Sequence, residues 1–217
     1  MISTILFDLD GTLVDTAPDL GHALNIQLQR HGKAALSDAV IRPFASHGSR
    51  GLIGLGFGIT PADAHFFVMR DEYLNIYDSV FTRSPTLLPG IAELLQVIER
   101  KSLTWGIVTN KPRRFTQRLI ESMKLHERAA CVVSGDDAPQ PKTSPATLLM
   151  ACEQVGVKPE HCVYVGDAER DIQAGKAAGM QTVVALFGYI DASDRPVEWG
   201  ADAMIKAPED LLNLLTA

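Results

Sequence analysis

The stretch Ile5-Leu-Phe-Asp-Leu-Asp-Gly-Thr-Leu-Val-Asp15 decides how the rest of the chain is interpreted. Its apolar start predicts a short buried strand. Asp8 and Asp10 follow, and strand periodicity would bring both carboxylates to the same side. Carboxylates that close repel each other unless a cation lies between them, and Mg²⁺ prefers such oxygen ligands. Taken alone, however, the pair is better explained as a polar strand end with an Asp-Gly turn.

The composition indicates an ordinary globular protein and narrows its partners. The 217 residues are 46% hydrophobic and 21% charged, with a net charge of −6. This charge provides no basic surplus for nucleic acid or an anionic membrane, whereas a small phosphate ester needs only one local positive site. The sequence leaves open whether the chain is a monomer or a homodimer.

Several features predict a cytoplasmic location. The three cysteines are an odd number without a disulfide framework, which favours a reducing compartment. The N-terminus has neither the basic nor the apolar region of a signal peptide. No apolar run is long enough to cross a bilayer.

The residues after Asp15 are predicted to be helical up to about residue 82. Leucines spaced four apart form the apolar stripe of a first amphipathic helix. Ser37 is suited to the N-cap of a second helix, which we expect to run towards residue 44. Thr60 and Pro61 fit the N-cap and first position of a third helix.

From Leu88 onward, predicted helices and strands alternate. The expected strands cover residues 104–109, 131–134, 162–167, 182–187 and 203–206. Apolar strands that alternate with helices form parallel sheets covered on both faces. We therefore predict an α/β fold, with a Rossmann-like doubly wound parallel sheet formed by residues 1–15 and 84–217. Residues 16–83 would be a separate, inserted, all-helical cap.

Polar residues follow four of the predicted strands, and ligands of open parallel sheets bind at these carboxyl ends. The residues are Asp8 and Asp10, Thr109 and Asn110, Lys142, and Asp167 with Asp171 four positions later. They offer acids for a cation, a hydroxyl and backbone N–H groups for phosphoryl oxygens, and an ammonium for developing negative charge. This combination is typical of phosphoryl transfer.

In this order, the four groups resemble the four motifs of the haloacid dehalogenase (HAD) superfamily phosphatases, and the insertion resembles that family's helical C1-type cap. The resemblance covers nearly the whole chain. Residues 134–136 and 188–190 resemble the phosphoglycolate phosphatase branch. Within it, residues 105–112 and 188–202 are similar to bacterial N-acetylmuramic acid 6-phosphate phosphatases. The resemblance implies a HAD-like catalytic core and a Mg²⁺-dependent phosphomonoesterase acting on a small phosphate ester.

The resemblance also implies roles for the residues of the first and last motifs. Asp8 would attack phosphorus and form an aspartyl phosphate. Asp10 would protonate the leaving alkoxide and later activate water. The metal ligands would be the carboxylates of Asp8 and Asp167 and the main-chain carbonyl of Asp10. Asp171 would orient Lys142 or a metal-bound water.

The phosphoryl group would be bound by Thr109, the backbone of Asn110 and Lys142. Taken singly, Thr109 is better explained as the cap of the following helix, and Lys142 as a solvated side chain. The prediction therefore depends on the motifs occurring together. One departure is visible, because the family usually follows the lysine with Pro-x-Pro and this chain has Lys142-Thr-Ser-Pro145, which restricts the loop less.

The cap segment Ser46-His-Gly-Ser-Arg-Gly51 lies between two predicted helices. It is equally well explained as a glycine-rich connector or as a loop that faces the active site. In the second case His47 and Arg50 would bind the substrate, because arginine grips carboxylates with two hydrogen bonds. The glycines of residues 51–58 lack the preceding strand and the spacing of a dinucleotide motif.

Alternative functions fit the sequence less well. Response-regulator receiver domains also combine acids, a threonine and a lysine, but their acid pair precedes the phospho-acceptor by two strands and they have no cap. Dehalogenases of the superfamily lack the second acid, which is present here as Asp10. A phosphomutase needs an acid/base pair from the cap, for which His47 is the only candidate. The substrate stays open, because phosphoglycolate and N-acetylmuramic acid 6-phosphate both carry a carboxylate.

Overall fold

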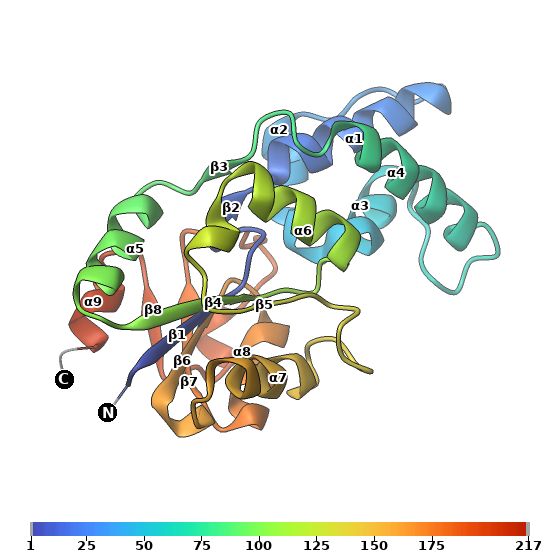
Figure 1. Ribbon diagram of the computed structural model, residues 1–217. Helices are drawn as coiled ribbons and strands as arrows, with labels where there is room; N and C mark the ends of the chain where they lie inside the picture. Colours follow the sequence, from blue (N-terminus) through green and yellow to red (C-terminus); the bar gives the residue numbers. More distant parts are fainter. Residues whose placement is uncertain (1, 216–217) are drawn as a thin grey trace.

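The computed structural model describes residues 2–215 (Figure 1). Its centre is a six-stranded parallel sheet with the strand order β5-β4-β1-β6-β7-β8. The strands are β1 (Thr4–Phe7), β4 (Thr104–Val108), β5 (Val132–Val133), β6 (Cys162–Gly166), β7 (Gln181–Ala185) and β8 (Ala203–Ile205). Because the chain continues from β4 to β5 on one side of β1 and from β6 to β8 on the other, the strand order reverses next to β1. The predicted doubly wound α/β sheet is confirmed.

Helices cover both faces of this sheet (Figure 1). They are α5 (Ile91–Arg100), α6 (Arg113–Ser122), α7 (Ala146–Val155), α8 (Glu169–Ala178) and α9 (Asp210–Leu214), with short 3-10 helices η2 (Leu125–Glu127), η3 (Pro159–His161) and η4 (Pro196–Glu198). Side chains of β1 alternate between the two faces, as strand geometry requires. Ile5 and Phe7 belong to the core with α5 and α6, and Leu6 belongs to the core with α7.

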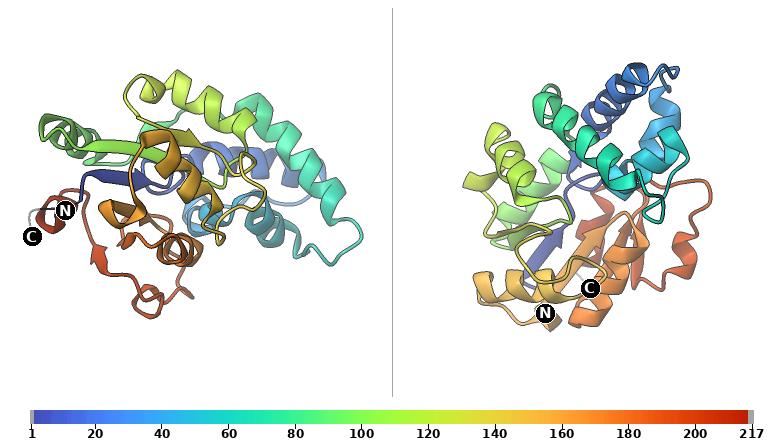
Figure 2. Two further views of the ribbon diagram at one scale, coloured as in Figure 1. Left: turned by 60° about the horizontal axis from the view of Figure 1, so that its bottom comes forward. Right: turned by 90° about the vertical axis from the view of Figure 1, so that its right-hand side faces the viewer.

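A block of helices lies between two short strands, β2 (Val14–Asp15) and β3 (Thr86–Leu87), which pair antiparallel. The block contains α1 (Ala17–Arg30), α2 (Asp38–Ile41), the 3-10 helix η1 (Arg42–His47), α3 (Gly48–Phe57) and α4 (Phe66–Val80). The strand pair holds the entry and exit of the block side by side, and the block lies over one end of the sheet (Figure 2). The division into a cap of residues 16–83 and a core remains a prediction.

Two details of the helical block differ from the sequence-based expectation. Thr60 and Pro61 do not begin a helix, because the chain forms i→i+3 turns there: the Asp63 N–H donates to the Thr60 carbonyl at 2.9 Å and the Phe66 N–H to the Asp63 carbonyl at 3.0 Å. Helix α4 begins only at Phe66. The helix after Ser37 has four residues, and at Arg42 the chain tightens into η1.

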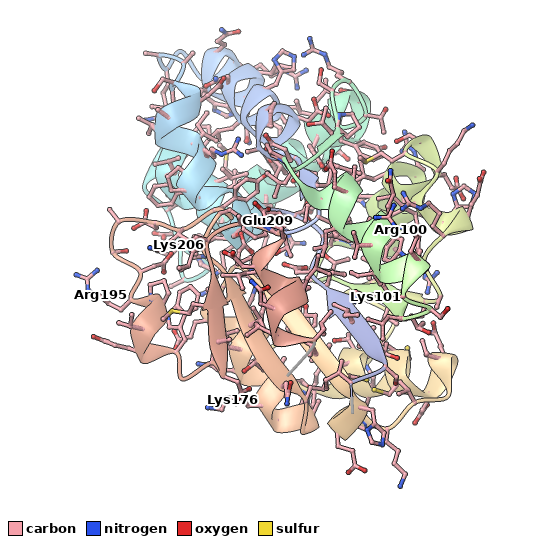
Figure 3. All side chains as sticks on the ribbon, turned by 90° about the vertical axis from the view of Figure 1, so that its left-hand side faces the viewer. Arg100, Lys101, Lys176, Arg195, Lys206 and Glu209 are labelled. Atoms are coloured by element: carbon pink, nitrogen blue, oxygen red, sulfur yellow. The ribbon has the colours of Figure 1, made fainter. Side chains whose placement is uncertain are left out.

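The helices of residues 2–215 and the basic side chains labelled in Figure 3 bear on the possible partners of the protein. None of the helices within residues 2–215 has the length and apolar character needed to cross a membrane. In Figure 3 the labelled basic side chains come from separate segments, namely Arg100 and Lys101 at the end of α5, Lys176 on α8, Arg195 after β7 and Lys206 after β8. This spread agrees with the net charge of −6.

Candidate active site

The carboxyl ends of the central strands and the helical block enclose one cavity of about 830 Å³. Seven residues that the sequence analysis singled out line this cavity: Asp8, Asp10, His47, Arg50, Thr109, Asn110 and Lys142. They come from the ends of β1 and β4, the loop before α7, and the segment around the start of α3. Residues far apart in the sequence therefore meet at one edge of the sheet, as a parallel sheet predicts.

Lys142 lies at the centre of the charged groups. Its Nζ is 2.8 Å from Oδ1 of Asp8 and 2.8 Å from Oδ1 of Asp171, and its side chain is fully buried. It also donates to the Tyr164 hydroxyl at 2.7 Å and to the Val108 carbonyl at 3.1 Å. Burial lowers the pKa of the ammonium, but the two carboxylates outweigh burial and the pKa is raised. Lys142 is therefore a permanent positive charge beside Asp8.

The side chain of Asn110 fixes the backbone of Lys142. Its Nδ2 donates to the Lys142 carbonyl at 2.8 Å, and its Oδ1 accepts from the Lys142 N–H at 2.8 Å. This two-point contact restrains the loop where the family's proline is absent. Thr109 is also buried, and its hydroxyl accepts from the Lys111 N–H at 3.1 Å. Because α6 begins only at Arg113, Thr109 does not cap that helix.

Three carboxylates form a buried acidic group, of which Asp8 lines the cavity and Asp167 and Asp171 lie behind the lining residues. One oxygen of each of Asp8, Asp167 and Asp171 lies within 4.8 Å of the others. Oδ2 of Asp167 accepts from the Ser46 hydroxyl at 2.6 Å and from the Tyr189 N–H at 2.8 Å. Its Oδ1 is buried and has no hydrogen-bond partner within residues 2–215. Burial, together with Asp8 and Asp171, raises the pKa of Asp167 to about 7.

Two glycines make this close packing around Asp167 possible. Gly11 has a φ of +81°, and a Cβ atom at this position would collide with the Asp167 carboxylate and the Tyr189 ring. A Cβ atom at Gly188 would collide with the Asp167 side chain as well. The backbone therefore encloses Asp167 from the β1 side and from the β7 side.

The carboxylate of Asp10 is not part of this acidic group. Its convergence with the Asp8 carboxylate was expected only if the strand continued as far as Asp10. Oδ1 of Asp10 accepts from the Thr16 hydroxyl at 2.6 Å and from the Lys111 ammonium at 2.9 Å. The physical reason is that β1 ends at Phe7 and the chain then turns, so that strand periodicity does not extend to Asp10.

Comparison with known proteins identifies the family. A family model described as haloacid dehalogenase-like hydrolase matches residues 5–185. The chain belongs to the haloacid dehalogenase-like hydrolases. It is 39% identical over 207 residues to a phosphoglycolate phosphatase of Xanthomonas campestris pv. campestris, with 95% of this chain and 93% of the relative covered. It is 35% identical over 214 residues to an N-acetylmuramic acid 6-phosphate phosphatase of Pseudomonas aeruginosa, with 99% and 95% covered.

Solved structures of haloacid dehalogenase-like hydrolases share the fold. A haloacid dehalogenase-like family protein from Streptococcus pneumoniae matches with a TM-score of 0.85, covering 99% of this chain and 98% of that one. The sequence identity is 20%, so this match shows the fold alone. The predicted HAD-like architecture is confirmed.

The acidic group of this haloacid dehalogenase-like hydrolase fits a divalent cation. Asp167 has one buried oxygen without a partner, and burial also raises the pKa of Asp8. Three buried carboxylates that share one buried lysine are only partly compensated, and a hard cation with oxygen ligands, such as Mg²⁺, would stabilise them. Asp171 is less available, because its Oδ1 contacts Lys142 and its Oδ2 accepts from the Ala168 N–H. Asp8 and Asp167 are therefore the carboxylates best placed to hold a metal.

Several residues of the hydrolase site were not given a role from the sequence. Lys111 and Tyr77 contact each other and line the cavity together with Arg70 and Arg170. Arg170 donates to the Ser46 carbonyl at 2.7 Å, so α8 contacts the helical block there. Their positions in the sequence could have indicated two of them, because Lys111 directly follows Thr109 and Asn110, and Arg170 lies between Asp167 and Asp171. Nothing in the sequence distinguished Tyr77 from the other aromatic residues of α4.

Proposed function

We propose that the chain is a Mg²⁺-dependent phosphomonoesterase that acts through an aspartyl-phosphate intermediate on a small phosphorylated metabolite. The observation that carries this proposal is that Asp8 and Lys142 contact each other and line one cavity, with the buried Asp167 carboxylate beside Asp8. A buried lysine between carboxylates, next to a carboxylate group suited to a cation, is what phosphoryl transfer requires. Family membership and the names of the two relatives support the same reaction.

Asp8 would be the nucleophile. Among residues 2–215, only Lys142 donates to its carboxylate, and it does so at Oδ1. The other oxygen is therefore available to form a bond to phosphorus while the ester P–O bond breaks. Asp10 would donate a proton to the leaving alkoxide and then take one from the water that attacks the aspartyl phosphate. Inorganic phosphate leaves, and the Asp8 carboxylate is restored.

The remaining groups would bind the phosphoryl unit. Thr109, the backbone of Asn110 and Lys142 lie along the cavity floor and offer hydrogen bonds and a positive charge. When bound by Asp8, Asp167 and the main-chain carbonyl of Asp10, Mg²⁺ would neutralise the carboxylates and the charge on the phosphoryl oxygens.

The cavity favours a substrate larger than phosphoglycolate. Its volume of about 830 Å³ far exceeds the needs of a two-carbon leaving group. Its wall from the helical block combines apolar Ile59 and Leu74 with the guanidinium groups of Arg50 and Arg70. A ring-sized leaving group with a carboxylate suits this mixture, since arginine binds carboxylates well. We therefore place a carboxylated sugar phosphate, such as N-acetylmuramic acid 6-phosphate, ahead of phosphoglycolate.

We also propose that residues 16–83 act as a cap over the core and that the enzyme is cytoplasmic. The cap assignment is supported by His47 and Arg50, which line the same cavity as the core residues. The location is supported by the cysteines, which are buried and free.

A panel of phosphate esters tests the function. Purified protein with Mg²⁺ is assayed for phosphate release from N-acetylmuramic acid 6-phosphate, phosphoglycolate and glucose 6-phosphate, which lacks a carboxylate. We expect the first ester to have the highest kcat/KM, at least about tenfold above the third, since one charged hydrogen-bonded contact is worth that much. A folded protein that releases phosphate from none of the three would overturn the proposal.

A further inference from the structure

Lys111 connects the helical block to Asp10. Its Nζ lies 2.9 Å from Oδ1 of Asp10 and 2.9 Å from the hydroxyl of Tyr77. Lys111 follows strand β4 in the sheet, whereas Tyr77 belongs to helix α4 of the block. The lysine side chain is only 5% exposed. Burial alone would lower its pKa, but Asp10 and Tyr77 outweigh burial and the pKa is raised, so the ammonium is charged.

The two oxygens of Asp10 have different surroundings. Oδ1 accepts from both Thr16 and Lys111. No residue within 2–215 donates to Oδ2, and Asp10 lines the cavity. Two donors thus hold one oxygen and leave the other for a group bound in the cavity. An acid/base group held in this way needs no search for its productive orientation when the substrate arrives.

The position of the Tyr77 hydroxyl depends on how α4 packs against the sheet domain. The Tyr77 ring is 2% exposed and lies 5.4 Å from the Phe81 ring and 5.1 Å from the Phe115 ring, centroid to centroid. Phe115 belongs to α6, which covers the sheet. Displacing α4 from α6 would therefore remove the tyrosine hydroxyl from Lys111 and free the ammonium to leave Asp10.

We propose that Lys111 is a positioning residue that holds the Asp10 carboxylate with Oδ2 towards the leaving group, and that Tyr77 makes this placement depend on the docking of α4. The inference rests on the proposed function, in which Asp10 protonates the leaving alkoxide. It makes the placement of the acid/base group depend on the packing of the helical block.

The test compares esters that differ in their need for protonation. Alkyl leaving groups need a proton from Asp10, whereas 4-nitrophenolate is stable without one. For wild type and Lys111→Met, the rate of the first turnover is measured with two substrates. One is 4-nitrophenyl phosphate, and the other is whichever of N-acetylmuramic acid 6-phosphate and phosphoglycolate the wild type cleaves faster. We expect the alkyl ester to be cleaved about 10 to 100 times more slowly, the loss that misplacing one acid/base group causes. The release of 4-nitrophenolate in the first turnover should change by less than about threefold, because that step needs no acid.

Tyr77→Phe is the milder variant and keeps the test informative if Lys111→Met does not fold. Tyr77→Phe should cleave the alkyl ester about 3 to 10 times more slowly than wild type and leave the first release of 4-nitrophenolate nearly unchanged. In the Lys111→Met background it should cause no further loss, because both changes act on one contact. Asp78→Asn is the matched control. Asp78 is the next residue on α4 and pairs with Arg118 of α6 at 2.6 Å on the exposed surface. Because exposed ion pairs contribute little to stability, this variant should leave α4 docked and does not touch Lys111.

The outcomes separate the inference from the function on which it rests. Equal losses on both esters, an unchanged Lys111→Met enzyme, or an Asp78→Asn enzyme as impaired as Tyr77→Phe would each overturn the positioning role while wild-type hydrolysis stands. A wild-type protein that cleaves no ester with Mg²⁺ would overturn the proposed function itself.

Discussion

At the scale of single residues, the site depends on side chains that hold other side chains. Asn110 does not contact a carboxylate, yet its amide makes two hydrogen bonds to the backbone of Lys142. Lys142 in turn contacts Asp8 and Asp171. The lysine is therefore placed by an amide in a loop that lacks the family's proline.

Replacing Asn110 with alanine should displace Lys142. We expect kcat/KM to fall by about 10 to 100 times, since a small misplacement of a charged group is costly. The free energy of unfolding should fall by about 1 to 3 kcal/mol, because two partly buried hydrogen bonds are lost. Steady-state kinetics and denaturant unfolding measure the two effects. Asn110→Asp keeps the acceptor for the Lys142 N–H and loses the donor, so its kcat/KM should lie between those of wild type and Asn110→Ala. Full activity in Asn110→Ala would show that the amide does not place the lysine.

The sequence predicted the residues of this site better than their partners. Asp8, Lys142 and Asp167 could be placed together because the carboxyl ends of parallel strands share one edge. The orientation of the Asp10 side chain could not be predicted, because it depends on hydrogen bonds from Thr16 and Lys111, which lie beyond the turn at Gly11. Side-chain partners of this kind depend on tertiary packing, for which strand periodicity provides no signal.

At the scale of elements, the turn after β1 is restricted by what packs against it. Gly11 has a positive φ, and its missing side chain leaves room for Asp167. Gly32 also has a positive φ, +68°, but a Cβ atom there would meet nothing within 4 Å. Substitution of Gly32 therefore measures the cost of the backbone conformation alone, whereas substitution of Gly11 adds the cost of the collision with Asp167.

Gly11→Ala should destabilise the protein much more than Gly32→Ala. Backbone strain alone costs about 1 kcal/mol, which is the expected loss at Gly32. At Gly11 overpacking against a buried carboxylate adds about 1 to 3 kcal/mol or more. Equilibrium unfolding in urea at one pH gives both values. Equal losses for the two variants would mean that Asp167 yields to the added methyl group at no cost.

Element prediction succeeded where a pattern was long enough to be read. The helices of the α/β part have apolar stripes, and α5 buries Ile91, Leu94, Leu95 and Ile98. Strands β2 and β3 have two residues each, too few for any periodicity. The predicted helix start at Thr60 was wrong, because residues 60–66 form i→i+3 turns that do not continue into an α-helix.

At the scale of the whole molecule, the acidic group makes stability depend on pH and metal. The pKa of Asp167 is raised to about 7 in the folded chain, against a usual value of 3.8. The folded state therefore binds a proton more tightly than the unfolded state between these values. The contribution of Asp167 to the free energy of unfolding is largest below pH 4, falls as the pH rises towards 7 and is constant above that.

In the presence of a chelator, Asp167→Asn should therefore have a higher Tm than wild type at pH 8, and the difference should shrink towards pH 5. Adding Mg²⁺ at pH 8 should raise the Tm of wild type, because a ligand that binds only the folded state stabilises it, and should have little effect on the variant. Differential scanning calorimetry gives both comparisons. A wild-type protein that is as stable as Asp167→Asn at pH 8 without metal would contradict this account.

The fold class was predictable from the alternation of helices and strands along the chain, whereas the contacts between the helical block and the sheet were not. Such contacts, including Ser46 with Asp167 and Arg170 with the Ser46 carbonyl, join residues more than 120 positions apart. No local pattern specifies such pairs. They depend on how the helical block packs against the sheet.

The central claim is that Asp8 takes the phosphoryl group, and it can be measured directly. Wild-type protein is mixed with excess substrate and Mg²⁺, quenched in acid within the first turnovers, digested and analysed by mass spectrometry. The account predicts a phosphoryl group on the peptide that contains Asp8, at that residue, and its loss in Asp8→Asn. Phosphate release by an enzyme that never carries phosphate on Asp8 at any quench time would contradict the account.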